Sequence, residues 1–95
     1  MPKIDLRCEG DETAGWACLV TIHERGRDLS RHRVRVAPTV LARLDPRALT
    51  PDALVRASFA FLLEREPPSA ILRSFDLEEI GRYFPSWETE VRRSG

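Results

Sequence analysis

The sequence has few of the features that mark exported, membrane-spanning or strongly charged proteins. Its 95 residues include two Cys, one Met and one Tyr, and 15 Lys plus Arg balance 15 Asp plus Glu. The formal net charge of zero excludes strong overall attraction to nucleic acid or membrane, so such binding requires a local patch. A chain of this length encloses one hydrophobic core, which excludes most large enzyme architectures.

Long apolar runs are also missing. Residues 1–10 alternate charged and apolar side chains and have no apolar segment, which predicts no secretory signal. The apolar run 57–63 is far shorter than the roughly 20 residues that a membrane-spanning helix needs. We therefore expect no membrane association and a cytoplasmic location.

Two cysteines and two histidines invite a zinc site, because thiolate and imidazole are ligands that zinc prefers. Cys8 and Cys18 are ten positions apart, and the sequence contains no CxxC or HxxxH pair. In the expected sheet, His23 also falls on the face opposite to that of Cys8, Cys18 and His32, so the four side chains cannot converge. We therefore expect no bound metal, and we expect two reduced, partly buried thiols.

Catalytic signatures are absent as well. The sequence contains no P-loop, GxGxxG, GxSxG or HExxH string. A nucleophilic pair of Cys18 and His32 would lie beneath packed helices, where a thiol has neither access nor a lowered pKa. We expect no enzymatic activity and no cofactor.

Three segments show the period-two alternation or β-forming composition of strands. They are residues 3–8, 16–23 and 29–36. Both faces of the second segment are mostly apolar, so we expect it in the middle of the sheet. Gly26 permits the tight turn of a hairpin between the second and third segments. If residues 25–27 form that loop, cross-strand partners sum to 52, which places Cys18 opposite Val34.

From Pro38 onward the periodicity becomes helical. The expected helices span residues 38–44, 51–66, 69–73 and 77–84, followed by a frayed turn at 87–92. Thr50 suits an N-cap and Pro51 a first helical position, and Asp76 with Glu79 forms a capping box. The expected fold class is α+β: a three-stranded antiparallel β-meander followed by three to four helices packed on one face, in a single domain of residues 1–95.

The outward side of the meander is a candidate basic binding face. It would carry five basic residues, Lys3, Arg7, Arg31, Arg33 and Arg35. The three arginines of the third segment would stand about 7 Å apart, a spacing comparable to that of successive phosphates. A solvated face balanced by nearby carboxylates and a docking face for an acidic protein surface are the alternatives.

The order strand, helix, helix over residues 31–36, 38–44 and 50–66 is also that of ribbon-helix-helix DNA-binding proteins. Alternating Arg on the strand fits that class. The expected pairing with residues 16–23 would compete with the intersubunit ribbon that such proteins form.

The C-terminal two thirds of the chain contains the string FLLEREP at residues 61–67, preceded by the segment 32–36 and followed by Ile71-Leu72, Phe75-Asp76 and Tyr83-Phe84-Pro85. With these strings it resembles a family of short uncharacterised bacterial proteins. The resemblance implies a bacterial or similar source. It implies no activity, so no functional residue is carried over.

These observations predict a small protein-interaction or self-association module, with nucleic-acid binding as the alternative. The edges of a three-stranded sheet are available for strand addition by a protein partner or a second copy. Tyr83, Phe84 and Trp87 are candidate interface aromatics, because aromatic residues are enriched at interaction hot spots. They are equally typical of the rim of a core.

Overall fold

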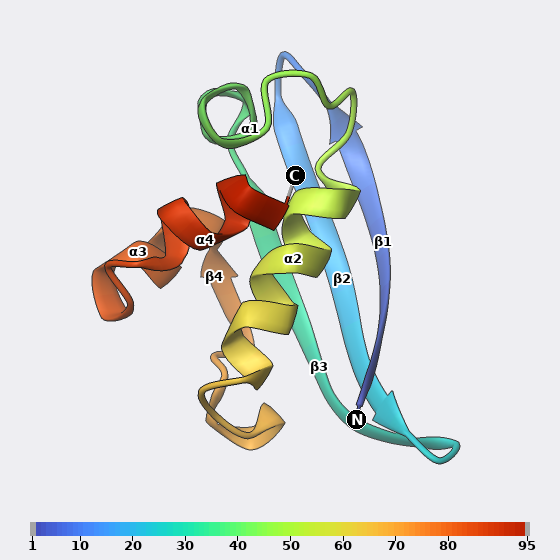
Figure 1. Ribbon diagram of the computed structural model, residues 1–95. Helices are drawn as coiled ribbons and strands as arrows, with labels where there is room; N and C mark the ends of the chain where they lie inside the picture. The colour runs from blue at the N-terminus through green and yellow to red at the C-terminus, as the bar shows by residue number, and fades with distance from the viewer. Residues whose placement is uncertain (1, 95) are drawn as a thin grey trace.

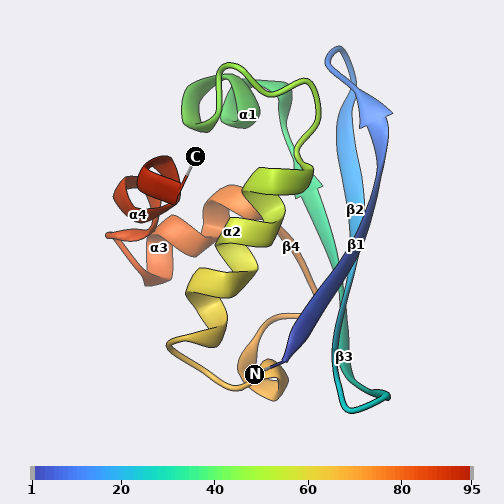
Figure 2. The same cartoon turned by 45° about the vertical axis from the view of Figure 1, so that its right-hand side comes forward.

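A computed structural model describes residues 2–94 and shows an α+β fold in two layers (Figure 1). A four-stranded sheet forms one layer, and the helices lie together on one of its faces (Figure 2). The sheet order is β1-β2-β3-β4, with β1 (Lys3–Asp11), β2 (Gly15–Glu24), β3 (Arg27–Val36) and β4 (Ser74–Asp76). The expected α+β class is confirmed, and each meander strand extends beyond the expected bounds.

The meander has the expected pairing over most of its length. Cys18 lies opposite Val34, and Trp16 lies opposite Val36. A β-bulge after Ile22 then shifts the register by one residue. The hairpin closes in a two-residue turn with positive φ at Arg25 (54°) and Gly26 (78°), the signature of a type I′ turn.

The expectation of three antiparallel strands is wrong in one respect, because the sheet is mixed. β4 pairs in parallel with β3, so that Val34 lies opposite Phe75 and Arg35 opposite Asp76. Parallel neighbours need a long crossover, which α1 and α2 provide here. β4 is fixed further by the bond from the Arg33 N–H to the Arg73 carbonyl (2.7 Å).

The helical segments agree with expectation at α1 (Pro38–Leu44) and differ elsewhere. The others are α2 (Asp52–Leu63), two 3₁₀ turns η1 (Pro68–Ala70) and η2 (Leu77–Glu79), α3 (Ile80–Tyr83) and α4 (Trp87–Ser94). α2 starts after Pro51, so Thr50 is not its N-cap. The capping box is present, with the Asp76 N–H donating to Glu79 Oε2 (2.7 Å), but it opens a 3₁₀ turn. No helix described is long and apolar enough to cross a membrane.

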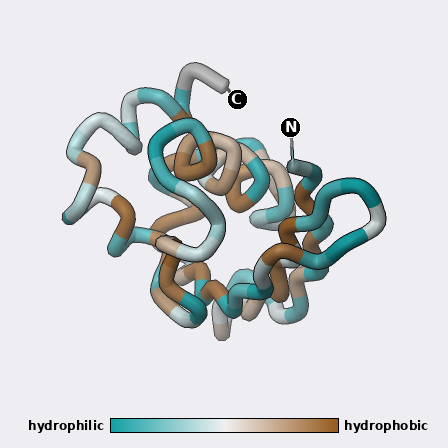
Figure 3. The backbone as a smooth tube through the Cα atoms, turned by 90° about the horizontal axis from the view of Figure 1, so that it is seen from below, coloured by the Kyte–Doolittle hydropathy of each residue, from teal (hydrophilic) through white to brown (hydrophobic). Residues whose placement is uncertain are grey.

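The core lies between the sheet and the helices. Apolar and polar positions alternate along the strands, as the colours of Figure 3 show. On β1, Ile4 and Leu6 are only half-buried, because β1 is an edge strand. The expected frayed C-terminal turn is instead α4, and its Trp87 is completely buried.

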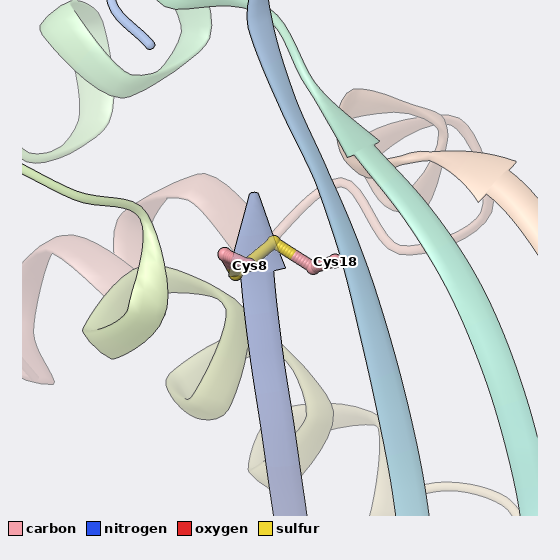
Figure 4. The surroundings of a disulfide bond; sticks show 2 residues. All are labelled: Cys8 and Cys18. Atoms are coloured by element: carbon pink, nitrogen blue, oxygen red, sulfur yellow. A yellow bond between two sulfur atoms is a disulfide. The ribbon is translucent and has the colours of Figure 1, made fainter. Parts of the chain in front are cut away.

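The two cysteines form a disulfide, so the expectation of reduced thiols is wrong (Figure 4). Cys8 on β1 lies directly opposite Cys18 on β2, with a Cα–Cα distance of 4.0 Å. The alternation of both strands points the two side chains toward the core face, where they meet.

Candidate functional site

The face of the sheet opposite the helices is solvent-exposed and carries the predicted basic residues. The outward positions are Lys3, Asp5, Arg7 and Glu9 on β1, Ala17, Leu19, Thr21 and His23 on β2, and Arg31, Arg33 and Arg35 on β3. Strand alternation therefore brings all five predicted basic side chains to one surface. We call it the outer face.

Ion pairs neutralise part of the outer face. Arg35 Nε lies 2.7 Å from Asp76 Oδ1, and Arg31 Nη2 lies 3.0 Å from Asp28 Oδ2. Lys3, Arg7 and Arg33 form no ion pair with any residue among 2–94. The charge of these three side chains is therefore available to a partner.

Arg7, Leu19 and Arg33 form one row across the outer face. Arg7 is paired with Leu19, and Leu19 is paired with Arg33. Two strand spacings put the arginine backbones about 9 to 10 Å apart. Leu19 between them is 53% exposed. No Phe, Tyr or Trp stands among the outward positions of β1 to β3, so the stacking surface of many RNA-binding sheets is not built there.

His23 and His32 lie on opposite faces of the sheet, as expected. On the outer face, His23 Nε2 lies 2.8 Å from Asp5 Oδ2. On the core face, buried His32 places Nδ1 2.7 Å from the Leu72 carbonyl and Nε2 2.8 Å from Ser30 Oγ. Burial, which disfavours the charged ring, lowers the pKa of His32 despite the carbonyl contact.

The cysteines and histidines that could form a nucleophilic pair or a zinc site have other partners in the structure. Cys18 is bonded to Cys8, so it has no thiol to pair with His32. Among residues 2–94, no three His, Cys, Asp or Glu side chains cluster as metal ligands would.

The three candidate interface aromatics occupy different environments. Trp87 is completely buried and is not accessible to a partner, while Phe84 is half-buried and packs edge-on against Phe61. Tyr83 is 68% exposed. Tyr83 and Phe84 line a groove of about 410 Å³ between the end of α2 and the segment from η1 to α3.

β1 forms an edge of the sheet with an unpaired outer side. The short Cα–Cα distance of Cys8 and Cys18 marks them as a non-hydrogen-bonded pair of the antiparallel ladder. Because the pattern alternates, the N–H and C=O groups of Ile4, Leu6, Cys8 and Gly10 point away from β2. The Ile4 carbonyl confirms this direction, since it accepts a bond from Arg56 Nη1 (2.6 Å) on α2.

The opposite edge of the sheet is partly closed. β4 covers β3 at Arg33–Arg35, where β3 has a neighbour on each side. A ribbon-helix-helix arrangement would use this strand between subunits and would have to displace β4. In Figure 1, by contrast, none of the helices and strands within residues 2–94 lies beyond β1.

Comparison with protein-family models, curated proteins and solved structures gave no match to this chain. The resemblance of its C-terminal two thirds to short bacterial proteins therefore stays a prediction.

Proposed function

We propose that the protein is a non-catalytic interaction module that binds a protein strand along β1. The observation that carries this proposal is the nine-residue edge strand, whose outward N–H and C=O groups at Leu6, Cys8 and Gly10 have no bond within residues 2–94. An added strand satisfies such groups by extending the ladder. A protein partner or a second copy of the chain can supply it.

Two substitutions at Leu6 test this proposal. Leu6→Pro removes the half-buried side chain and the outward N–H, whereas Leu6→Ala removes only the side chain. We expect partners captured from cells of the native host to bind the wild type and Leu6→Ala but not Leu6→Pro. Quantitative mass spectrometry of the captured proteins, including the chain itself, measures this difference. Equal capture by all three proteins would contradict the proposal.

The same edge can be examined in the isolated protein. At high dilution, the amides of Leu6 and Cys8 should exchange with solvent much faster than those of Arg7 and Glu9, which face β2. Slow exchange at Leu6 and Cys8 under these conditions would mean that the edge is already covered, and it would rule out strand addition there.

Nucleic-acid binding through the outer face is a second candidate, favoured by Arg7 and Arg33 standing without ion pairs on either side of Leu19. Binding to a short DNA duplex should then weaken steeply as salt is added. Arg33→Ala should lower the slope of log affinity against log salt by about one. Arg47→Ala removes an exposed arginine outside this face and should leave the slope unchanged. Absence of a gel shift at low salt would remove this candidate.

The cytoplasmic location predicted from the sequence is also a proposal, and the disulfide removes one of its supports. Disulfides are rare in the cytoplasm of most organisms. Alkylation in cells lysed directly into denaturant tests the location, because a cytoplasmic chain should hold Cys8 and Cys18 as thiols that react, and a chain in an oxidising compartment should hold them as a disulfide that does not.

A further inference from the structure

The charges on the free edge alternate in sign. Along β1 the outward side chains are Lys3, Asp5, Arg7 and Glu9. Charged side chains on an edge strand normally discourage pairing with foreign strands. A partner strand whose charges alternate in the opposite order avoids this repulsion. A second copy of β1 that runs antiparallel presents its charges in that order.

Resting on the proposed strand-binding function, we propose that the partner is a second copy of this chain. The two β1 strands pair antiparallel around a twofold axis, with Leu6 opposite Leu6 of the partner subunit. The residue numbers of facing positions then sum to 12. The result is a continuous eight-stranded sheet with the helices of both copies on the same side, because an axis perpendicular to the sheet keeps its two faces distinct.

Backbone direction limits the possible registers. The groups that point outward belong to even-numbered residues, so those residues must face one another as hydrogen-bonded pairs. In the proposed register, Leu6 faces its own copy and Ile4 faces Cys8. The Ile4 carbonyl already accepts a bond from Arg56, but a carbonyl oxygen has a second lone pair for the incoming N–H.

Charge then selects among the registers that remain. A sum of 12 places Asp5 opposite Arg7 and Lys3 opposite Glu9, which gives four attractive pairs by symmetry. These residues occupy the non-hydrogen-bonded pairs of the new ladder, where side chains approach most closely. Arg7 and Lys3 are also two of the basic side chains without an ion pair within the described chain.

The neighbouring registers bring like charges together. A sum of 14 places Arg7 opposite itself and Asp5 opposite Glu9. A sum of 10 places Asp5 opposite itself and Lys3 opposite Arg7. A sum of 16 keeps the pair of Arg7 and Glu9 but places Asp5 opposite Asp11. A sum of 8 places Lys3 opposite Asp5 and brings no like charges together, but it pairs only residues 2–6 and gives two attractive pairs instead of four. Like charges directly opposite one another are destabilising, so the register with a sum of 12 is the most favourable for the charges of this edge.

Apolar side chains add to the interface on the core face. Ile4 and Leu6 are half-buried in the monomer, because β1 has no neighbour on its outer edge. In the proposed register, Leu6 packs beside Leu6 of the partner subunit across the axis. The association therefore combines backbone bonds, ion pairs and the burial of apolar surface that the monomer leaves accessible.

Sedimentation of the full chain over a range of about 1 µM to about 1 mM tests the proposal. The wild type should pass from monomer to dimer within this range. Glu9→Lys places Lys opposite Lys3 at two symmetric positions and should weaken the dimer about tenfold or more. The double change Lys3→Glu/Glu9→Lys restores the opposite charges and should restore the dimer. Glu12→Lys, in the turn after β1, is the matched control and should leave association unchanged.

Amide exchange provides the second measurement. On dimer formation, exchange at Leu6 and Cys8 should slow, while Arg7 and Glu9 should stay as protected as in the monomer. A protein that stays monomeric at the highest concentration, a dimer that Glu9→Lys does not weaken, or a weakened dimer that the double change does not restore would overturn the proposal. The strand-binding function would survive a monomeric result if Leu6 and Cys8 exchange rapidly and Leu6→Pro still abolishes capture of another host protein.

Discussion

Trp87 Nε1 donates a hydrogen bond to Ser58 Oγ at 3.0 Å, and the same oxygen donates to the Leu54 carbonyl at 2.8 Å. Both side chains are completely buried. The pair joins α4 to α2 in the middle of the core and satisfies the polar atom of the largest buried side chain.

Replacing Ser58 should therefore lower the stability of the protein, although its side chain is small. Ser58→Ala leaves the indole N–H without its acceptor, and we expect the free energy of unfolding to fall by about 1–3 kcal/mol. Urea denaturation measures this change. Ser69→Ala, at an exposed position, should have almost no effect. If both variants unfold at the same urea concentration, the hydrogen bond does not stabilise the protein.

Leu62 on α2 is 3% exposed, and its truncation should open a cavity. We expect Leu62→Ala to lower the free energy of unfolding by about 2–5 kcal/mol. Leu49→Ala is the matched control, because Leu49 is 90% exposed and its side chain has little packing to lose. A loss below about 0.5 kcal/mol for Leu62→Ala would contradict the orientation of α2.

Acid should destabilise the protein through His32. Burial lowers the pKa of His32 below its ordinary value, so the unfolded chain binds the proton more tightly than the folded chain. This contribution to stability is present above about pH 6.5, the unfolded pKa, and is lost as the pH falls below it.

Unfolding experiments between about pH 7.5 and pH 5 would measure the decline. His32→Gln should reduce it, whereas His23→Gln, on the outer face, should retain it. An unchanged pH dependence in His32→Gln would show that other groups cause the decline.

Reduction of the disulfide should weaken the fold without abolishing it. Cys8 and Cys18 enclose a short loop, for which the chain-entropy model gives about 2–3 kcal/mol. Denaturation with and without a reductant measures this difference. The Cys8→Ala/Cys18→Ala double variant should be insensitive to the reductant. Identical wild-type curves under both conditions would mean that the disulfide does not form.

The register of the meander was predictable because alternation fixes which side chains face the core. Cys18 opposite Val34 follows from the pattern and one turn glycine. β4 was not predictable in the same way, since three residues contain no period and their pairing depends on packing after the crossover. α4 was predicted only as a frayed turn at 87–92, because its sequence is mostly polar and its apolar contacts come from Trp87 and Val91, one helical turn apart.

The candidate site was also predictable from the sequence only in part. The common face of Arg7, Arg31 and Arg33 follows from strand parity alone. The ion pairing of Arg35 does not, because Asp76 reaches it only through β4. The charge alternation of β1 was visible in the sequence, but its meaning depended on knowing which edge of the sheet stays open.

The parallel junction of β3 and β4 has a consequence for the order of assembly. The meander strands are neighbours along the chain, whereas Arg33 and Ser74 meet across 41 positions. Closing the longer loop has the larger entropic cost, so the hairpins can nucleate folding and β4 joins after the rate-limiting step. Weakening the Arg25–Gly26 turn should then slow folding, whereas weakening the contact between Arg35 and Asp76 should mainly accelerate unfolding.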